Sequence, residues 1–353
     1  MRELYDIYSL QLFATHVNVT TDAPTQADPT HNDLSPEMKT FYDMTLIDEA
    51  QANLVHDQFG QKRPIPKNGG KTIEFRKFAP LAKALTPITE GVTPDGNVLN
   101  VSTITSEISQ YGDYIVQSDI LELTALDNTI LEATKLLGRQ AGMTLDTVTR
   151  NVLQAATNVT FASKWSGSTE TQVEARDDMD ETSVLKVDTV NQVVAKLRSV
   201  NAPTINGKYV AIIHPFVAYD LMRDPEWIDA HKYATPENLY AGEIGEIGGV
   251  RFVQTSEALI IKDNTCPTDS DSNPLAVFST LFLASGAYGI TEITGGGLQT
   301  IIKQKGSAGT ADPLDQRSSV GWKAIKTAEL LIPDYLVRVE SVSTRFSSTA
   351  AAN

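Results

Sequence analysis

The chain has 353 residues, of which 41% are hydrophobic and 21% charged, and this balance excludes wholesale disorder and a fibrous repeat. Its length exceeds the roughly 250–300 residues at which single hydrophobic cores stop growing, so two or more structural units are expected. The formal net charge of −15 argues against nucleic-acid binding as the main task, because neutralising phosphates requires clustered Lys and Arg.

The first predicted segment, residues 1–34, is an N-terminal arm without a sustained apolar period. Its acids outnumber the single Arg2 and are Glu3, Asp6, Asp22, Asp28 and Asp33. Such a segment is expected to be mobile by itself. Residues 35–60 then predict a helix, because Ser35 is a favourable N-cap and Pro36 fits the first helical position. Apolar residues recur every four residues on one face of this helix, at Met38, Tyr42, Leu46, Ala50 and Leu54.

The segment Gly70–Asp119 predicts an extended β-hairpin, in which a long stretch rich in Pro, Thr and Gly separates two strands. Ile73 and Phe75 alternate with polar residues in the first strand. In the second strand the apolar alternation shifts by one residue between Thr103 and Ile104, which predicts a β-bulge. An isolated two-stranded hairpin is marginal in water, and its open edges invite pairing. The hairpin is therefore expected to lie across a neighbouring copy of the chain.

A long helix is predicted from Asp127 or Asn128 to about Asn158. Its apolar stripe consists of Ile130, Ala133, Leu137, Ala141, Leu145, Val148, Val152 and Ala155. Gly138 and Gly142 lie inside this helix, where glycine is unfavourable, so close packing against another element is expected there.

An α/β unit follows the long helix. Helices are predicted at Val187–Val200 and Phe216–Arg223, and strands at Lys208–Pro215, Val250–Gln254, Ala276–Leu283, Gln299–Lys305, Val320–Thr327 and Tyr335–Val342. Two polar loops are predicted, at Asn264–Asn273 and Ser307–Gln316.

No catalytic, metal or cofactor site is expected. The histidines are too widely spaced to pair with one another or with a cysteine as zinc ligands, and they are His16, His31, His56, His214 and His231. His214 is interpreted as a strand-end histidine bonded to backbone, with a general base facing a pocket as the alternative. Gly242–Gly249 lacks the flanking strand, helix and lysine of a phosphate-binding loop, so it predicts a turn. Cys266 has no cysteine partner, and no apolar run is long enough to cross a bilayer.

Two charged groups of residues stand out. The basic hairpin set consists of Lys62, Arg63, Lys67, Lys71, Arg76, Lys77 and Lys83. The acidic set consists of Glu170, Glu174, Asp177, Asp178, Asp180 and Glu181. Two interpretations of these sets stay open. The first is that both sets only face solvent, as blocks of like charge usually do. The second is a subunit interface, in which the basic hairpin set of one copy meets the acidic set of another.

Six segments carry a family resemblance. They are TPITEGVTPDG (Thr86–Gly96), YGDYIVQSD (Tyr111–Asp119), LGRQAGMTLDTVTRNVLQAATN (Leu137–Asn158), YVAIIHP (Tyr209–Pro215), GEIGEIGGVRFVQT (Gly242–Thr255) and DPLDQRSSVGWKA (Asp312–Ala324). In this order they resemble the major capsid (coat) protein of tailed bacteriophages, in the family typified by the N-four-like short-tailed phages. The resemblance covers the chain from about Met44 to Glu340.

The resemblance implies an α+β coat-protein fold with an N-terminal arm, an extended loop, a peripheral domain with a spine helix, and an axial domain. The implied segments are 1–34 for the arm, 35–60 for the helix leading into the loop, 61–117 for the extended β-hairpin loop, 118–183 for the peripheral domain, 184–331 for the axial domain, and 332–353 for the return to the peripheral domain and the C-terminal tail. In this interpretation Asn264–Asn273 is a surface or axis-facing insertion.

The resemblance also implies a function. The chain would be a structural subunit of the virion capsid, assembling in the host bacterial cytoplasm as pentamers and hexamers of an icosahedral shell around double-stranded DNA. Its implied partners are other copies of itself, a separate scaffolding protein and a portal protein, with a decoration protein as an optional further partner and with no cofactor and no membrane. No N-terminal maturation cleavage is expected.

Three alternatives remain at this point. An encapsulin-like nanocompartment shares the fold but packages enzymes. A cytosolic α/β enzyme would be a discrete monomer or small oligomer with a ligand pocket. A tail or fibre protein is disfavoured, because the chain has no internal repeat.

Overall fold

The computed structural model describes residues 46, 49–50, 54–66, 70–78, 81, 83–85, 87, 90–91, 96–124, 129–167, 169–231, 245–269, 273–292, 296–307 and 312–353. The chain divides into two compact units. Unit 1 comprises residues 1–51, 112–141 and 298–323, and unit 2 comprises residues 52–111, 142–297 and 324–353. Each unit is described by itself below. The N-terminal arm, residues 1–34, lies outside the described residues.

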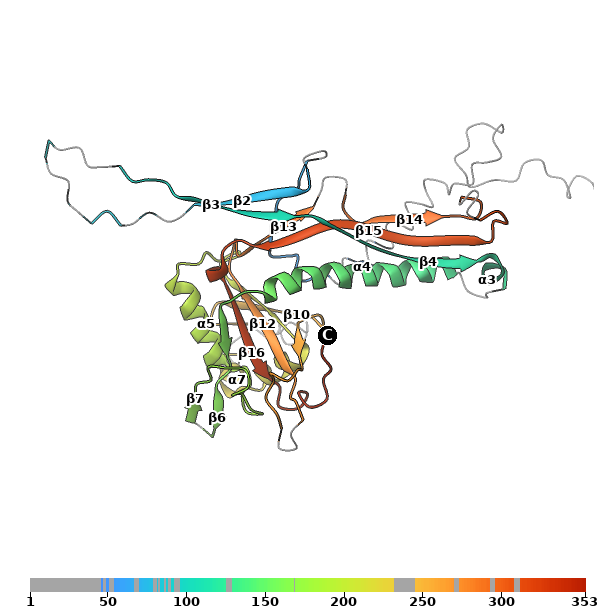
Figure 1. The fold of residues 1–353 in the computed structure, drawn as a ribbon. Coiled ribbons are helices and arrows are strands. Elements are labelled where there is room, and N and C mark those ends of the chain that lie inside the picture. Colours follow the sequence, from blue (N-terminus) through green and yellow to red (C-terminus); the bar gives the residue numbers. More distant parts are fainter. Residues whose placement is uncertain are drawn as a thin grey trace, which may run out of the picture. The chain divides into compact units, whose positions relative to one another are not determined.

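A seven-stranded mixed sheet forms the centre of unit 2 (Figure 1). Its order is β5 (Val159–Phe161), β16 (Leu336–Val342), β12 (Val277–Leu283), β8 (Tyr209–Ile213), β10 (Val250–Gln254) and β9 (Glu246–Ile247), with β11 (Ile260–Ile261) paired to β12. Strand β8 is parallel to β10 and antiparallel to β12. Every residue of β8 and β12 is buried, which is typical of strands covered on both faces.

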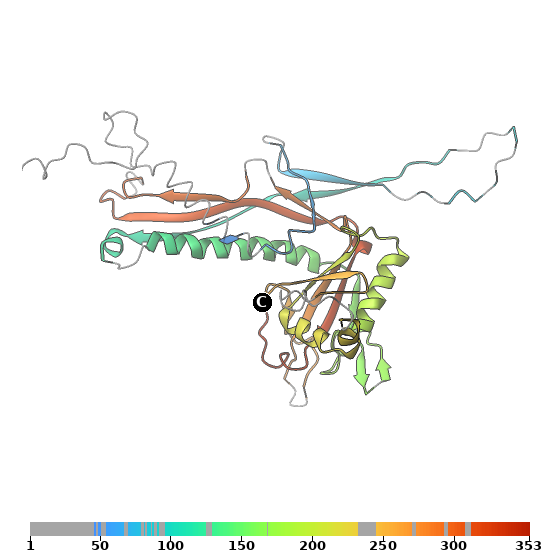
Figure 2. The same ribbon diagram turned by 180° about the vertical axis from the view of Figure 1, so that it is seen from behind.

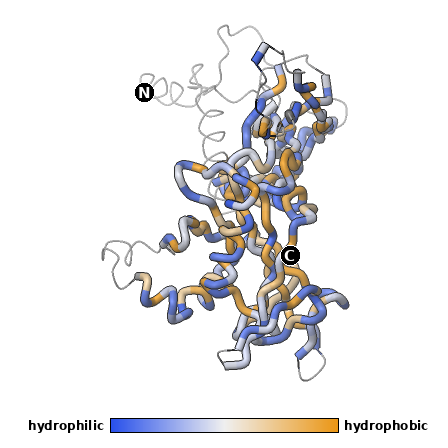
Figure 3. Tube along the Cα trace, turned by 90° about the vertical axis from the view of Figure 1, so that its left-hand side faces the viewer, coloured by the Kyte–Doolittle hydropathy of each residue, from blue (hydrophilic) through white to orange (hydrophobic). Residues whose placement is uncertain are grey.

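Helices cover the central sheet. They are α5 (Val187–Ser199), α6 (Pro215–Met222) and α7 (Pro225–His231). Phe278 and Phe282 of β12 belong to the same core as Val190 and Leu197 of α5. Leu281 lies in a second core with Leu153, because neighbouring residues of a strand point to opposite faces. Figure 3, coloured by hydropathy, shows hydrophobic stretches of the chain running through the middle of the tube.

The sequence patterns predicted the α/β part well. The predicted strands and helices match β8, β10, β12, β14 (Gln299–Lys303), β16, α5 and α6 to within a few residues at each end. The predicted strand Val320–Thr327 is part of a longer strand, β15 (Arg317–Leu330). The patterns did not show η3 (Pro333–Tyr335), α7, or the strands β5, β6 (Lys164–Ser166), β7 (Thr169–Thr171), β9, β11 and β13 (Tyr288–Glu292).

The hairpin of unit 2 is confirmed as β2 (Thr72–Phe78) and β3 (Val101–Glu107), which form a sheet of their own beside β13 (Figures 1 and 2). The predicted bulge is wrong, because the pairing runs without interruption from Thr72↔Glu107 to Phe78↔Val101. The shift in the apolar pattern instead arises because the apolar residues before and after it lie on opposite faces of β3. Ile104 and Ser106 are covered, whereas Val101 on the other face is exposed.

The root of the hairpin, defined here as residues 54–66, is not helical. The helix predicted for residues 35–60 therefore ends before Leu54, and most of it lies outside the described residues. The backbone N–H groups of Val55 and His56 donate to the Asp146 side chain, which withdraws them from helical bonding. Strand β1 (Gln61–Lys62) then pairs in parallel with β13.

Unit 1 contains α3 (Asp119–Thr124), the first part of α4 (Thr129–Gln154), most of β4 (Ser109–Ser118), and the pairing of β14 with the first part of β15. Helix α4 is shorter than predicted at its end, and the positions Asp127 and Asn128 lie outside the described residues. Ala133, Leu137 and Ala141 are buried as predicted.

The long helix departs from the predicted stripe beyond Leu145. Leu145 itself is buried, but Ala155 is exposed, contrary to the prediction. The predicted close packing at Gly138 is confirmed, since a Cβ added there would lie 2.9 Å from the carbonyl oxygen of Leu46. Gly142 is buried.

The strands β4 and β15 approach closely in unit 1 because each has a glycine at the contact. A Cβ at Gly112 would lie 2.6 Å from the carbonyl oxygen of Trp322, and one at Gly321 would lie 2.9 Å from that of Asp113. Gln140 of α4 connects the same strands by donating to Asp113 (2.6 Å) and accepting from the indole N–H of Trp322 (3.3 Å).

We expect Gly321→Ala to destabilise the chain by about 1–3 kcal/mol, because the new methyl group would press on backbone that cannot move without separating β4 from β15. Urea unfolding followed by tryptophan fluorescence measures the change. Gly96→Ala is the matched control, since a Cβ there has no atom within 4 Å. Equal stability of the two variants would contradict the close approach.

Candidate functional site

The described part of the hairpin carries a group of exposed apolar side chains. This group, the apolar loop surface, consists of Leu81, Leu85, Val98, Leu99 and Val101, and its members are between 49% and 81% exposed. Several exposed apolar residues on one hairpin favour an interaction surface over ordinary solvent-facing positions. The sequence predicted an interaction for this hairpin, and the structure shows which side chains are free to make it.

The base of the same hairpin is anchored to its own chain. Phe75 is 3% exposed and its ring lies against Gly289 of β13, where an added Cβ would come within 2.9 Å of it. The guanidinium of Arg63 lies 5.6 Å from the centre of the Phe75 ring. Ser106 and Thr327 share a hydrogen bond of 3.0 Å between their hydroxyl groups. One face of the hairpin is therefore satisfied within the subunit, while the apolar loop surface is not.

The basic hairpin set is mostly exposed, with Lys77 half-buried and Lys67 outside the described residues. The acidic set is also exposed except for the half-buried Asp180, and it extends from β7 toward α5. Glu170 accepts from Ser163 (2.7 Å), and Asp180 accepts from the backbone of Thr182 (2.8 Å). Among the ion pairs of the described residues, none joins the two sets.

A buried ionic cluster lies within unit 2 beside the acidic set. Glu340 of β16 is completely buried and accepts from Arg176 at 2.6 and 2.8 Å, and it lies 3.2 Å from Arg338. The hydrogen bond to Glu340 raises the pKa of Arg176, whereas burial lowers the pKa of Arg338. Arg176 also donates to Thr265 (2.9 Å). The cluster ties the segment that carries the acidic set to the central sheet. The sequence analysis did not predict this cluster, because Arg176 by itself resembles an ordinary surface charge.

His214 behaves as the strand-end histidine that was predicted. Its Nδ1 accepts the backbone N–H of Phe216 (3.2 Å) and so caps the start of α6. Its ring packs 4.7 Å from the Phe216 ring and 5.1 Å from the Phe278 ring, centre to centre. Burial lowers the pKa of His214 from its ordinary 6.5 to about 4. The imidazole is accordingly neutral at pH 7 and serves as a capping acceptor.

His214 makes stability depend on pH. Because its folded pKa of about 4 lies below its ordinary 6.5, the contribution is complete above pH 6.5 and is lost as the pH falls toward 4. His214→Asn keeps a capping acceptor but cannot titrate. We expect the free energy of unfolding of the native chain to fall by about 1–2 kcal/mol more than that of the variant between pH 7 and pH 4.5. An equal fall in the free energy of unfolding for the native chain and for His214→Asn between the two pH values would contradict this role.

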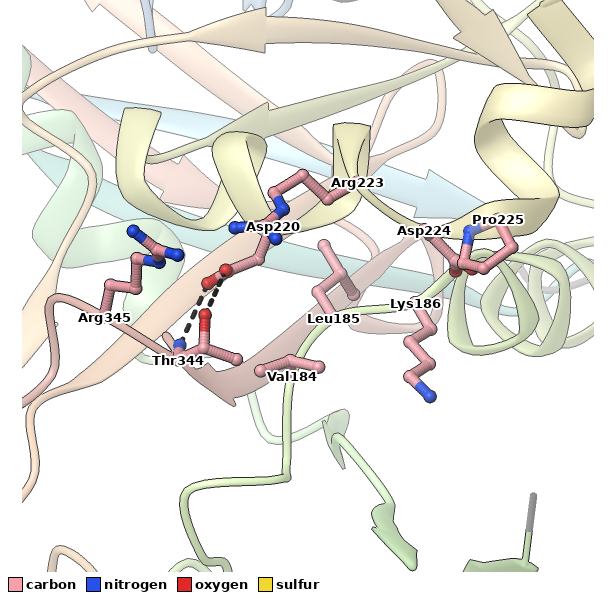
Figure 4. Close-up of a pocket in the computed structure, with 9 residues that line it drawn as sticks. All are labelled: Val184, Leu185, Lys186, Asp220, Arg223, Asp224, Pro225, Thr344 and Arg345. Atoms are coloured by element: carbon pink, nitrogen blue, oxygen red, sulfur yellow. Dashed lines mark hydrogen bonds between the residues drawn. The ribbon is translucent and has the colours of Figure 1, made fainter. Parts of the chain in front are cut away.

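A hollow of about 450 Å³ lies where the segment after β16 meets α6 (Figure 4). Asp220 points at Thr344, accepting from its N–H (3.1 Å) and its hydroxyl (2.5 Å). Asp224 accepts from the N–H of Val187 at the start of α5 (2.9 Å). Both carboxylates therefore hold chain segments together, and the hollow is a structural junction.

The remaining sequence candidates have structural explanations. Gly248 and Gly249 have φ values of 62° and 83° and form the turn between β9 and β10, as predicted, whereas residues 242–244 lie outside the described part. Cys266 is buried, and burial raises the pKa of its thiol. In the part of the chain that the structure describes, no group of His, Cys, Asp and Glu could hold a metal ion, and no helix is long and apolar enough to cross a membrane.

Comparisons with known proteins agree with this geometry. A family model described as phage capsid protein matches residues 5–290. The capsid structure of cyanophage Pam1 is similar at a TM-score of 0.63 and 11% identity, covering 94% of this chain and 99% of that chain. The capsid of Ralstonia phage GP4 has a TM-score of 0.62 and 13% identity, and the match covers 82% of this chain and 88% of that chain. The capsid structure of cyanophage P-SCSP1u has a TM-score of 0.60 and 14% identity, and the match covers 81% of this chain and 87% of that chain. No curated protein matches the sequence. The predicted α+β coat-protein fold is confirmed.

Proposed function

This chain belongs to the phage capsid protein family, and from that membership we propose that its copies form the pentamers and hexamers of an icosahedral shell around double-stranded DNA. It is a major capsid protein, a structural component of the virion and not an enzyme. The observation that carries the proposal is the hairpin, whose base packs on its own chain while the apolar loop surface stays exposed.

The apolar loop surface of one copy is proposed to lie on unit 1 of a neighbouring copy. Unit 1 presents its own exposed apolar residues, which are Tyr114, Val116, Leu121, Leu123 and Leu136. Burying an exposed Leu or Val side chain contributes about 1.5–3 kcal/mol, so two such surfaces in contact supply a favourable interaction. Because each copy then both gives and receives a hairpin, the contact is heterologous and repeats around a ring.

The charged sets are proposed to orient this contact. The exposed Lys62, Arg76 and Lys83 would approach the exposed Glu174 and Asp178 of another copy. Complementary charges steer association and fix its register. Assembly rate and yield should therefore fall as salt rises toward about 1 M, where screening acts over about 3 Å. An assembly rate independent of salt would leave both sets as solvated surfaces.

Several finer assignments are also proposals. The segments 118–183 and 184–331 would be the peripheral and axial domains, and the chain would fall in the N-four-like subgroup, which the motifs given above support. Further proposed partners are a separate scaffolding protein and a portal protein, with a decoration protein as a possible addition. Assembly is proposed to take place in the host bacterial cytoplasm.

Expression of the full chain with and without a co-expressed scaffolding protein tests the proposal. Size-exclusion chromatography and negative-stain microscopy should show megadalton closed particles. DNA inside particles purified from infected cells would distinguish a genome container from a shell that packages enzymes. A stable monomer under all assembly conditions, with the apolar loop surface covered by its own chain, would overturn the proposal.

A further inference from the structure

A network of buried polar groups holds the root of the hairpin. Asp146 of α4 is completely buried and accepts from the backbone N–H groups of Val55 (2.9 Å) and His56 (2.7 Å). Its other oxygen lies 2.6 Å from Nδ1 of His56, which is also completely buried. One carboxylate therefore satisfies three donors of the root. A buried carboxylate with three such partners is a strong attachment, because unpaired buried donors are costly.

The next residue of the root extends the network to two further elements. Asp57 accepts from the hydroxyl of Thr149 on α4 (2.6 Å) and from the ammonium of Lys326 on β15. Lys326 is 2% exposed and donates also to the carbonyl of Leu145 (3.0 Å). The hydroxyl of Tyr288 on β13 donates to the carbonyl of His56. Burial raises the pKa of Tyr288, so its hydroxyl remains a donor.

The network and the hairpin lie on opposite faces of the same two strands. Tyr288 and Lys326 are network members, and each is followed by a residue that contacts the hairpin, Gly289 and Thr327 respectively. Successive side chains of a strand point to opposite faces. The pair β13 and β15 is therefore held on one face by the network and contacts Phe75 and Ser106 on the other. Packed elements transmit such constraints.

Glycine residues allow the root and the base of the hairpin to approach β13 closely, one on each face. A Cβ at Gly60, in the root, would lie 2.6 Å from the Tyr288 ring and 2.7 Å from the Ile290 side chain. A Cβ at Gly289 would lie 2.9 Å from the Phe75 ring on the other face. The root continues along β13, where the N–H of Arg63 donates to Ile290 (3.0 Å). The root, the two strands and the hairpin base are thus in continuous contact.

We propose that the His56–Asp146 network is a latch that fixes the orientation of the hairpin on its own subunit before the hairpin docks on a neighbour. This inference rests on the proposed function only in its last step. Holding an arm in its bound orientation lowers the conformational entropy lost on association, so a preorganised arm associates more readily. Among the described residues, Nε2 of His56 has no hydrogen-bond partner, so the bond from Nδ1 to Asp146 is the one that holds the ring there.

Hydrogen exchange on the unassembled full chain tests the latch. In Asp146→Asn, amide exchange should accelerate at least tenfold in the root and in β2 and β3, while β12 keeps its native rate. Glu132→Gln is the matched control, because Glu132 is an exposed carboxylate on the same helix. Thr149→Val is a milder variant of similar shape, which removes the bond to Asp57 and the longer one to the carbonyl of Leu145, and it decides the matter where Asp146→Asn does not fold.

The outcomes separate the latch from the assembly proposal. Local acceleration, together with assembly at least tenfold slower than for Glu132→Gln, supports the latch. Uniform acceleration throughout unit 2, no acceleration, or local acceleration with assembly at the control rate would each overturn it. Failure of the native chain to assemble under any condition would count against the proposed function, while the exchange measurement would still report on the root.

Discussion

The double variant Leu99→Asp, Val101→Asp is expected to prevent shell assembly while the chain keeps its fold. Both side chains are exposed in the subunit, so their loss removes little internal packing. In the proposed shell they are buried against a neighbour. Losing about 1.5–3 kcal/mol for each side chain weakens one contact on the order of 100-fold to 10,000-fold.

Leu99 is 59% exposed and Val101 is 49% exposed in the subunit, so folding does not depend on their burial. Far-ultraviolet circular dichroism and urea unfolding should therefore be close to native, whereas size-exclusion chromatography should show no particles. Thr103→Asp is the matched control, since Thr103 lies exposed on the same face of β3 but is already polar. Particles of normal yield from the double variant would contradict the role of the apolar loop surface.

The sequence predicted the central sheet best. Strand β8 is a continuous apolar run, and β12 is an apolar run interrupted only by Ser279 and Thr280. Such runs are typical of strands covered on both faces. Their pattern is local, so it can be read without knowing the partners. The helices α5 and α6 were also predicted, each to within one residue at either end.

Strand β13 could not be predicted, because it carries a glycine in its interior, which weakens a strand pattern. The structure explains that glycine only through a contact with Phe75, a residue far away in sequence. The end of the apolar stripe on α4 was misread for a related reason. The structure buries Asp146 and Thr149 there, and both are polar residues that the periodic pattern assigns to solvent.

The polar groups that hold the molecule together were also beyond sequence reasoning. Asp57, Asp146 and Lys326 lie in three separate parts of the chain, and each by itself resembles an ordinary surface charge. Only the fold brings them to the root of the hairpin. The hairpin itself was predictable from its strand patterns, whereas the side chains that anchor it were not.

Glu340→Ala is expected to destabilise unit 2 by about 3–5 kcal/mol, because it leaves the partly buried cations of Arg176 and Arg338 without their shared carboxylate. Urea unfolding measures the loss. The matched control is Glu246→Ala, which removes a half-exposed partner of Lys208 and should change stability by less than about 1 kcal/mol. A loss no larger than in the control would show that solvent compensates the two arginines. The contrast follows from burial, since water replaces a lost partner at the surface but cannot reach the completely buried position of Glu340.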